Sequence, residues 1–442
     1  MIKVLKFGGS SLADAAQFRK VKAIIEAEPE RRYVVASAPG KRFYEDEKVT
    51  DLLLRCHALN KERNPFEDTF QRIADRFCGI IKDLGLSLSI EEELETVRKA
   101  IANGVSVDYV ASRGEYFNSM ILADFLGVPF IDAAECIFFT ADGKLDSKKT
   151  NTVIENRLAM TPRAVIPGFY GVLPSGEIKT FSRGGSDISG SIVAEAVDAT
   201  LYENWTDVSG MLMADPRIID NPAPIDIITY RELRELSYMG ATVLHEDAIF
   251  PVRRSGIPIN IRNTNQPEDP GTMIVPHTEE KNSDRLVTGI AGKSGFTAIY
   301  IEKDMMNSEL GYGRRVLETL ERRGISFEHL PSGIDTVTVV VNTAALEGKL
   351  DTVVADLKRT VCPDTIRVYD HLAMLAVVGR NMVSAPGVAA RVFAALAREN
   401  VNIRMIDQGS SELNIIVGIA EKDLLPALHS LYKEFAPKGN NA

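Results

Sequence analysis

The sequence has few cysteines, and they form no recognisable cluster. Its four cysteines are scattered, without a C-x-x-C pair or a group of histidines nearby, at Cys56, Cys78, Cys136 and Cys362. Metal sites built on cysteine require such groupings. We therefore interpret these residues as reduced cysteines in the core of a cytosolic protein, and not as metal ligands.

Basic residues are not in excess, and long apolar runs are missing. The formal net charge of −10 argues against a nucleic-acid partner, although it permits a local positive pocket for an anion. Apolar runs such as residues 372–379 are too short to cross a bilayer. The N-terminus enters a strand-like run directly, without the basic and apolar segments of a signal peptide. We expect a soluble, cytoplasmic protein without a membrane or nucleic-acid partner.

Up to about residue 275, strand-like runs alternate with helical patterns. This alternation predicts an α/β sandwich with a mainly parallel sheet. The expected strands cover 2–7, 33–40, 128–135, 163–171 and 199–210, and a Pro-Ser-Gly turn predicts a hairpin over 171–181. A chain of 442 residues predicts two to four domains, and the polar stretch 277–285 is the best candidate for a linker.

Beyond the linker the chain repeats itself. Residues 311–341 align with 387–417 without a gap, at a constant offset of 76 residues, so that Gly311 meets Gly387. Each copy has the pattern strand, helix, strand, strand and a further helix, which predicts a βαββαβ module. The repeat fits either a ligand-binding module or a purely structural one.

A glycine turn follows the first apolar strand. Gly8 and Gly9 stand between this strand and a helical pattern that begins near Leu12. Glycine lets backbone N–H groups approach a ligand, and a helix directs its positive end at such a turn. With Lys6 beside it the turn suits an anion, but a simple strand-to-helix turn with an exposed lysine fits the pattern as well.

Further polar residues stand at the ends of apolar runs. Arg183 to Asp187 form a second glycine turn before a helix, where an arginine can grip a carboxylate in two places. Asp187 either caps this helix or takes part in function. Glu115 is expected in a loop before a helical pattern, and Thr206 and Asp207 follow a strand.

The signatures of other kinase classes are missing. The sequence contains no G-x-x-x-x-G-K-[ST] motif and no H-R-D or D-F-G motif, which excludes P-loop and protein kinases. His245 by itself fits a structural histidine better than a catalyst. The two glycine turns, with Lys6 and Arg183, nevertheless predict a site for more than one anionic group.

Five ordered motifs together resemble those of the aspartate kinase family. They are KFGGSS, SRGE, FSRGGSD, TDVSGMLMADPR and GATVLH, and the two repeats follow them. The resemblance covers nearly the whole chain. It implies a three-layer amino-acid kinase fold over 1–278, a linker over 279–285, and ferredoxin-like ACT modules over 286–366 and 367–438. It also implies ATP-dependent phosphorylation of L-aspartate to 4-phospho-L-aspartate, the first step toward lysine, threonine and methionine.

By the family's pattern the site residues fall into several groups. Lys6 and Asp187 are catalytic, and the phosphate contacts come from Gly8, Gly9, Ser10, Gly184 and Gly185. The substrate is bound by Thr50, Glu115, Arg183 and Ser186, and the nucleotide by Thr206, Asp207, Leu212 and Arg217. Mg²⁺ arrives with ATP and is held mainly by phosphate oxygens and water, so we expect no metal site of the protein's own. The substrate carboxylate is already ionised, so no general base is required.

The resemblance also implies feedback control through the ACT modules. The family's effector site corresponds to Ser308, Gly311, Tyr312, Ser326, Phe327 and Glu328, with Ser326 and Glu328 expected on a strand opposite the 307–313 loop. Glu328 is suited to receive a lysine side chain, which favours lysine over threonine as the effector. Paired modules imply a homo-oligomer, either a dimer or a tetramer.

Two features depart from the family's pattern. Thr242 stands where many relatives have a lysine that reaches the nucleotide, and the 38–51 loop is longer than in many relatives. Lys41 or Lys48 in that loop is a candidate for the missing charge.

Two other functions remain open beside an aspartate kinase with feedback control. A non-catalytic amino-acid sensor is one, although it has no need of an intact Lys6, Arg183 and Asp187. A kinase of another acidic amino acid is the other, and testing glutamate as substrate separates it. The chain ends soon after its second repeat, so we expect no fused homoserine dehydrogenase.

Overall fold

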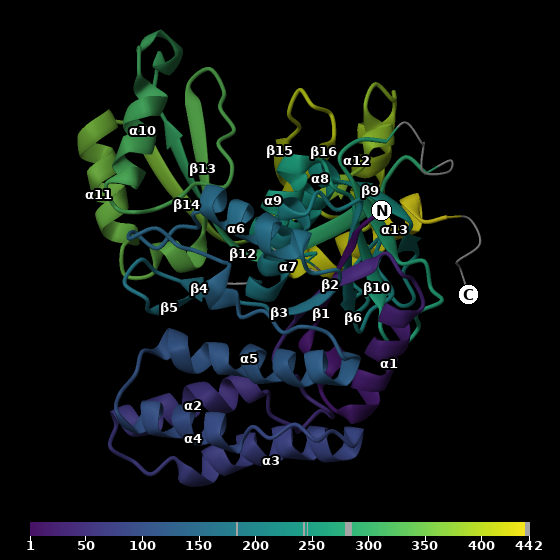
Figure 1. Ribbon diagram of the computed structural model, residues 1–442. Coiled ribbons are helices and arrows are strands. Elements are labelled where there is room, and N and C mark those ends of the chain that lie inside the picture. Colours follow the sequence, from purple (N-terminus) through teal and green to yellow (C-terminus); the bar gives the residue numbers. More distant parts are fainter. Residues whose placement is uncertain (183, 242–243, 245, 279–284, 438–442) are drawn as a thin grey trace. The chain divides into compact units, whose positions relative to one another are not determined.

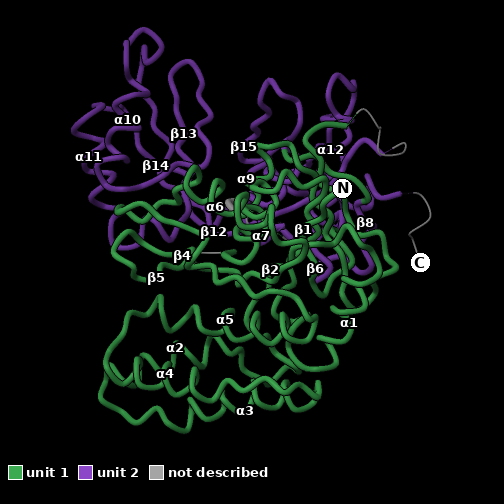
Figure 2. Tube along the Cα trace, viewed as in Figure 1, with its two compact units in different colours: residues 1–211, 226–230, 243–278 green, residues 212–225, 231–242, 279–442 purple. Residues whose placement is uncertain are grey.

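The chain divides into two compact units (Figure 2). In this computed structural model, residues 1–182, 184–241, 244, 246–278 and 285–437 are described. The first unit comprises residues 1–211, 226–230 and 243–278, and the second comprises 212–225, 231–242 and 279–442. No helix in the described ranges is both long and apolar enough to span a membrane.

The first unit is built on a seven-stranded sheet. Its strand order is β3-β2-β1-β6-β10-β11-β9, and only the β10–β11 pair is antiparallel. The strands are β1 (Lys3–Phe7), β2 (Arg31–Ala36), β3 (Ala164–Pro167), β6 (Leu201–Thr206), β9 (Ile227–Thr229), β10 (Ile259–Asn263) and β11 (Thr272–Val275). The prediction of a mainly parallel α/β sheet is confirmed. Parallel sheets are covered by helices on both faces, which accounts for the nearly continuous burial of β1 and β2.

Helices cover this sheet from two sides. Helix α5 (Val107–Leu126) packs on β2 and β3, and α7 (Gly185–Ala196) packs on β1, β2 and β6 from the other side (Figure 1). The other α-helices of this unit are α1 (Ala15–Glu26), α2 (Val49–Lys61), α3 (Glu67–Leu84), α4 (Glu91–Ala102), α6 (Ser147–Ala159) and α9 (Phe250–Ser255). Helix α8 (Tyr230–Tyr238) belongs to the second unit from Arg231 onward. The result is the expected three-layer sandwich.

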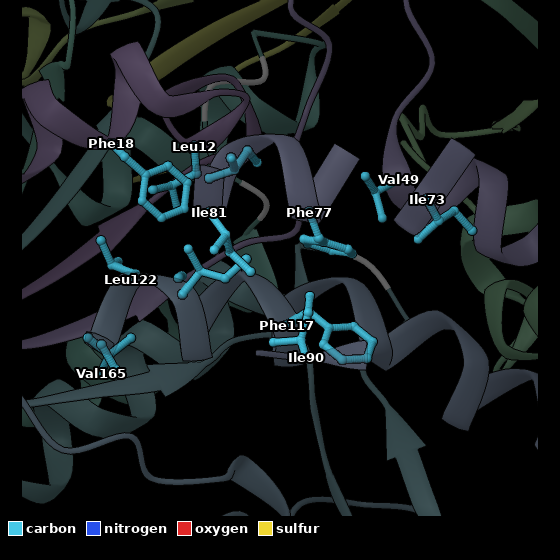
Figure 3. Close-up of a cluster of buried hydrophobic side chains, with 14 of the residues drawn as sticks. Leu12, Phe18, Val49, Ile73, Phe77, Ile81, Ile90, Phe117, Leu122 and Val165 are labelled. Atoms are coloured by element: carbon cyan, nitrogen blue, oxygen red, sulfur yellow. The ribbon is translucent and has the colours of Figure 1, made fainter. Parts of the chain in front are cut away.

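The main core of the first unit lies among α1 to α5 and the sheet (Figure 3). Phe18 of α1, Phe77 of α3 and Phe117 of α5 are at most 1% exposed. The rings of Phe77 and Phe117 lie 5.3 Å apart between centroids. Full burial of such a side chain stabilises the fold by about 1.5–3 kcal/mol. This core holds α5 and β1 rigidly, and both carry residues of the candidate site.

Two local predictions for this unit have different outcomes. The hairpin is confirmed, because β4 (Tyr170–Val172) pairs antiparallel with β5 (Ile178–Thr180). The strand expected over 128–135 is wrong. Phe130 makes one isolated bridge with β3, and a 3-10 turn then begins at Ala133. Asp132 caps this turn by accepting from the Ala134 N–H, which ends the extended segment.

The second unit carries a five-stranded antiparallel sheet of order β13-β12-β14-β16-β15. Its strands are β12 (Gly289–Glu302), β13 (Thr336–Asn342), β14 (Thr365–Val378), β15 (Ile403–Asp407) and β16 (Asn414–Ala420). Its helices are α10 (Tyr312–Glu321), α11 (Leu350–Val361), α12 (Val388–Arg398) and α13 (Leu424–Phe435). The short strands β7 (Met211–Leu212) and β8 (Pro224–Ile225) form a separate two-stranded sheet.

The internal repeat is confirmed at its helices. Gly311 and Gly387 are the N-caps of α10 and α12, and both adopt left-handed backbone conformations with φ of 76° and 88°. The modules differ in one strand. The segment 325–330 is no strand, since only His329 forms an isolated bridge with Val340. Pro331 follows and has no N–H to extend a ladder.

The two modules share their longest strands. Ile299 and Ile301 of β12 pack in the core of the first module. Ile290, near the start of the same strand, packs in the core of the second module with Leu375 and Val377 of β14. Each long strand therefore serves both modules.

Candidate active site

The first glycine turn leaves β1 next to the end of β6. The Gly8 N–H donates to the Trp205 carbonyl at 2.9 Å, and a 3-10 turn follows over Gly9–Leu12. Helix α1 begins only at Ala15, and Asp14 caps it by accepting from the Gln17 N–H. The prediction that a helix directs its positive end at this turn is therefore wrong, because the N-cap carboxylate occupies that end.

The glycines of this turn meet a second loop backbone to backbone. A Cβ on Gly9 would lie 2.9 Å from the Ala38 carbonyl oxygen, and one on Gly40 would lie 2.6 Å from the Gly9 carbonyl carbon. The Gly40 N–H also donates to the Gly9 carbonyl at 2.8 Å. No side chain fits at either position, so the start of the long 38–51 loop forms one wall of the turn. Sequence reasoning missed Gly40, although it is the glycine of a visible Pro-Gly pair.

The second glycine turn leads directly into a helix, as predicted. Gly184 is the N-cap of α7 with a left-handed φ of 58°, and no side chain caps the helix. A Cβ on Gly185 would lie 2.4 Å from the ring of Phe169. The first N–H groups of α7 therefore have no side-chain cap, which is the usual arrangement at an anion site. Asp187 lies in this first turn and does not act as the cap.

Lys6 and Asp187 form an ion pair between the two turns. The Lys6 Nζ lies 2.6 Å from Asp187 Oδ1, and the Asn204 amide donates to the same oxygen at 2.8 Å. Lys6 belongs to β1 and is only 8% exposed, so its alternative interpretation as an exposed turn lysine is wrong. Asn204 of β6 was not predicted, although it stands two residues before Thr206 in the motif that drew attention to this strand.

Glu115 is a buried carboxylate without an ion-pair partner among the described residues. It lies inside α5 and not in a loop before it, which corrects the prediction. Burial raises its pKa to about 8, while the Ala38 amide and the charges of Arg113 and Lys6 act in the opposite direction. Its Oε2 is buried without a hydrogen-bond partner. A cationic ligand would satisfy this oxygen and favour the ionised form.

Two hydroxyl residues approach the site from different elements. A Cβ on Gly114 would lie 3.7 Å from Thr50 Oγ1, which places Thr50 of α2 beside the helix that carries Glu115. Ser186 lies in the first turn of α7, and its Cβ is 2.7 Å from the position of a Cβ on Gly168. Both residues are half-buried.

The residues predicted to contact the nucleotide fall into both units. Thr206 ends β6, where its hydroxyl donates to the Asp207 carboxylate at 3.2 Å and its carbonyl accepts from the Thr264 N–H. Leu212 and Arg217 belong to the second unit. There the exposed Arg217 pairs with Asp215 at 2.6 Å. Arg183, Thr242 and His245 lie outside the described residues.

Comparisons with known proteins bear on this arrangement. The amino acid kinase family model matches residues 1–263, and an ACT domain model matches residues 375–435. Aspartokinase 3 of Bacillus subtilis is 38% identical over 449 residues, which cover 98% of each chain. The chain belongs to the aspartokinase family. It is therefore a kinase enzyme.

Solved structures of aspartokinases extend this relationship to the fold. The crystal structure of Clostridium acetobutylicum aspartate kinase is 53% identical, with a TM-score of 0.87 over 98% of this chain and 99% of that one. Escherichia coli aspartokinase III in complex with aspartate and ADP is 26% identical, with a TM-score of 0.78 and the same coverage. The same enzyme with lysine and aspartate gives a TM-score of 0.72.

The described residues of this aspartokinase offer no metal cage. They contain no group of three or more histidine, cysteine, aspartate or glutamate side chains placed to hold an ion. Of the four cysteines, Cys56 and Cys136 are buried as predicted and Cys78 is half-buried. Cys362 is exposed, so its prediction as a core residue is wrong. The carboxylate between the two glycine turns is that of Asp187. One of its oxygens already binds both Lys6 and Asn204. This donor set suits a metal ion that arrives with the nucleotide and keeps phosphate and water ligands.

The predicted effector residues lie in two segments of the second unit. Gly311 and Tyr312 start α10, and Ser308 ends a 3-10 turn before it. The other predicted effector residues lie in the irregular segment that replaces the expected strand; they are Ser326, Phe327 and Glu328. The Glu328 N–H donates to the Val340 carbonyl, but no strand ladder continues from this bond. No hydrogen bond or ion pair of these described residues joins the two segments.

Two features of these segments suit a ligand. The Tyr312 hydroxyl is buried without a hydrogen-bond partner. The half-buried Glu328 carboxylate accepts a hydrogen bond from the Tyr238 hydroxyl. Burial raises the pKa of Glu328, so a nearby cation would favour its ionised form.

Proposed function

We propose that this kinase transfers the γ-phosphoryl group of ATP to the side-chain carboxylate of L-aspartate. A bond forms between a carboxylate oxygen and phosphorus, the bond to the β-phosphate oxygen breaks, and the products are 4-phospho-L-aspartate and ADP. The observation that carries the proposal is the Lys6–Asp187 pair, held at 2.6 Å between two glycine turns. The product is the first intermediate toward lysine, threonine and methionine.

At the phosphate end, Lys6 neutralises charge that develops as the phosphoryl group moves. Phosphoryl transfer depends mainly on positioning and on electrostatic stabilisation. Gly9 and Ser10 supply backbone N–H groups on one side, and Gly184 and Gly185 supply them at the uncapped start of α7 on the other. Gly8 forms the turn beside the phosphates, but its own N–H is bound to the Trp205 carbonyl. Asp187 orients the Lys6 ammonium, and Mg²⁺ enters as the MgATP substrate, held by phosphate oxygens and water.

At the substrate end, the buried Glu115 carboxylate receives the ammonium group of aspartate. The Glu115 Oε2 atom is buried without a hydrogen-bond partner, and it gains one when the ammonium group binds. Arg183 grips the α-carboxylate with its planar fork, and Thr50 and Ser186 add hydrogen bonds. The side-chain carboxylate of aspartate is ionised at neutral pH, so it attacks without a general base.

The remaining assignments concern the nucleotide and the chain's organisation. Thr206, Asp207, Leu212 and Arg217 contact the nucleotide. We propose a catalytic domain over 1–278, a linker over 279–285, and ACT modules over 286–366 and 367–438. The enzyme acts in the cytoplasm as a homo-oligomer, a dimer or a tetramer that pairs through its ACT modules.

The effector site lies in the first ACT module, and its ligand is lysine. Glu328 receives the side-chain ammonium, and the backbone at Gly311 and Tyr312 receives the carboxylate. The other contacts come from Ser308, Ser326 and Phe327. Aspartokinase III of Escherichia coli has been crystallised with lysine and aspartate, which supports an amino-acid effector for this relative.

A coupled ADP-release assay tests the catalytic proposal. L-aspartate should give turnover that requires Mg²⁺, and L-glutamate should give turnover at background level. Lys6→Met in the same assay should lower the turnover with aspartate by about 10²–10³-fold. Turnover with glutamate alone would assign the site to another acidic amino acid, and no turnover with either substrate would leave a non-catalytic sensor.

A further inference from the structure

Arg76 of α3 reaches both backbones that frame the first glycine turn. Its Nη1 donates to the Ala13 carbonyl and to the Gly40 carbonyl, each at 3.2 Å. Ala13 closes the segment that begins with Gly8 and Gly9, and Gly40 is the residue whose backbone lies against Gly9. One guanidinium therefore joins the two walls of the predicted phosphate site.

The same guanidinium holds the rest of the long loop. Its Nη2 donates to Asp46 Oδ2 at 2.6 Å, and the Arg76 and Asp46 side chains are only 5% and 7% exposed. Arg42 binds the same carboxylate with two side-chain N–H groups and its backbone N–H. The two arginines and a backbone N–H hold the pKa of Asp46 far below its usual range. The loop is thus closed on itself through Asp46 and tied to α3 through Arg76.

The start of the loop is fixed independently of Arg76. The Ser37 N–H continues the sheet by donating to the Phe7 carbonyl, and the Val49 N–H donates to the Pro39 carbonyl. Ala38, whose amide hydrogen-bonds to the Glu115 carboxylate, therefore depends on the sheet. Arg76 instead contacts the loop at the Gly40 carbonyl and at Asp46, and it makes no hydrogen bond to Ala38.

We infer that Arg76 is a positioning residue for the phosphate-binding turn, because it holds residues 8–13 and the 40–47 loop in a fixed arrangement around the nucleotide phosphates. The inference rests on the proposed function, since it takes the glycine turn as the phosphate site. A planar guanidinium can satisfy three acceptors in different directions, and an ammonium on a flexible stem cannot reproduce this geometry. Small displacements of groups that position a reactant are costly in rate.

The test compares Arg76→Lys with Arg72→Lys. Arg72 lies one turn earlier on α3, and its exposed side chain pairs with Glu47 of the same loop. Arg76→Lys should raise KM for ATP and lower kcat, together about 10–100-fold in kcat/KM for ATP, with KM for aspartate within about twofold. Arg72→Lys should match the wild type, because exposed pairs contribute little. Fluorescence of Trp205, the single tryptophan and 1% exposed, reports whether each variant is folded.

Asp46→Asn provides the second variant. It keeps the volume of the side chain and weakens the tie to Arg76, so it should move KM for ATP in the same direction by a smaller factor. If Arg76→Lys does not fold, Asp46→Asn tests the inference alone, and it should raise KM for ATP while leaving KM for aspartate unchanged. Folded variants with wild-type KM for ATP, or with a change confined to KM for aspartate, overturn the inference. Lys6→Met tests the proposed phosphate site separately from the role of Arg76. If the Lys6→Met enzyme stays active, the assignment of the phosphate site is wrong, whatever the result for Arg76.

Discussion

Lys6 Nζ lies 2.6 Å from Asp187 Oδ1, and the Asn204 amide binds the same oxygen. The three side chains come from β1, α7 and β6, so these contacts join two interior strands of the sheet to the start of a helix. Because Asn204 fixes the carboxylate, the ammonium has a defined direction before any substrate binds. Such preorganisation lets a charge stabilise a transition state without reorganisation at the moment of reaction.

Lys6→Met should lower kcat for aspartate phosphorylation by about 10²–10³, the usual cost of losing one preorganised charge-stabilising group. Methionine keeps the length and the apolar stem of a side chain that is 8% exposed, so the fold should be retained. The coupled ADP-release assay measures the loss. Lys3→Met is the matched control on the same strand, because Lys3 pairs with Glu28 and lies away from the turn. A folded Lys6→Met enzyme with near-wild-type kcat would show that Lys6 has no part in phosphoryl transfer.

The buried Glu115 carboxyl predicts a pH-dependent affinity for aspartate. Its pKa is raised to about 8, and only its ionised form can receive an ammonium group. KM for aspartate should therefore fall as pH rises from about 6.5 to 8, by up to about tenfold per pH unit. Initial rates at saturating ATP across this range measure the effect. Glu115→Gln should bind aspartate weakly at every pH, so a variant with the wild-type profile would remove Glu115 from the substrate site.

The raised pKa of Glu115 also predicts how the stability of the fold changes with pH. The folded state holds the Glu115 proton more tightly than the unfolded state, whose pKa is near the ordinary value of 4.5. Between pH 4.5 and 8 the free energy of unfolding should therefore fall as pH rises, by at most about 1.4 kcal/mol per pH unit. Denaturant unfolding of wild type and Glu115→Gln measures this term as the difference between their pH slopes. Parallel slopes would contradict a raised pKa.

Arg183→Lys should impair the enzyme almost as much as Arg183→Ala. A guanidinium binds a carboxylate with two parallel hydrogen bonds, and an ammonium replaces only the charge. The main defect should be a raised KM for aspartate, because the proposed ligand is its α-carboxylate. Steady-state kinetics with each substrate varied in turn show which constant moves. A defect confined to KM for ATP would assign Arg183 to the phosphates instead.

Much of the fold was predictable because the spacing of apolar residues and the residue types at turns are both visible in short stretches of sequence. The parallel strands, the hairpin at Pro-Ser-Gly and the glycine N-caps of α10 and α12 all follow from short stretches of sequence. The sharing of β12 between two cores was not predictable. A linear repeat assigns each strand to one module, whereas pairing of β12 with β14 along both halves depends on contacts distant in the chain.

The candidate site was predicted better in its residue types than in its geometry. The family resemblance assigned both Lys6 and Asp187 to catalysis, and the structure brings their side chains into contact. The burial of Lys6 and of Glu115 could not be predicted, because it depends on neighbours from other elements. Asn204 and Gly40 were missed for the same reason. The capping of α1 by Asp14 is a local contact with Gln17 and was missed.

The last prediction concerns the Tyr238–Glu328 contact in the second unit. The Tyr238 hydroxyl donates to the Glu328 carboxylate, which is the group proposed to receive the ammonium of lysine. Lysine must therefore replace this hydrogen bond on binding. Lysine should inhibit the wild type at millimolar concentration, and Glu328→Ala should relieve inhibition without lowering uninhibited activity. Such an effector typically acts with about 1–3 kcal/mol of coupling between its site and the active site.

Tyr238→Phe separates competition from a structural role of the tyrosine. It removes the hydroxyl alone, so half-inhibition should occur at a lysine concentration about fivefold lower, the equivalent of one hydrogen bond of about 1 kcal/mol. Threonine, which lacks the side-chain cation, should inhibit neither variant more than the wild type. Inhibition curves at fixed aspartate measure both effects. A wild type that is insensitive to millimolar lysine, or a Glu328→Ala enzyme that remains fully sensitive, would move the effector site away from Glu328.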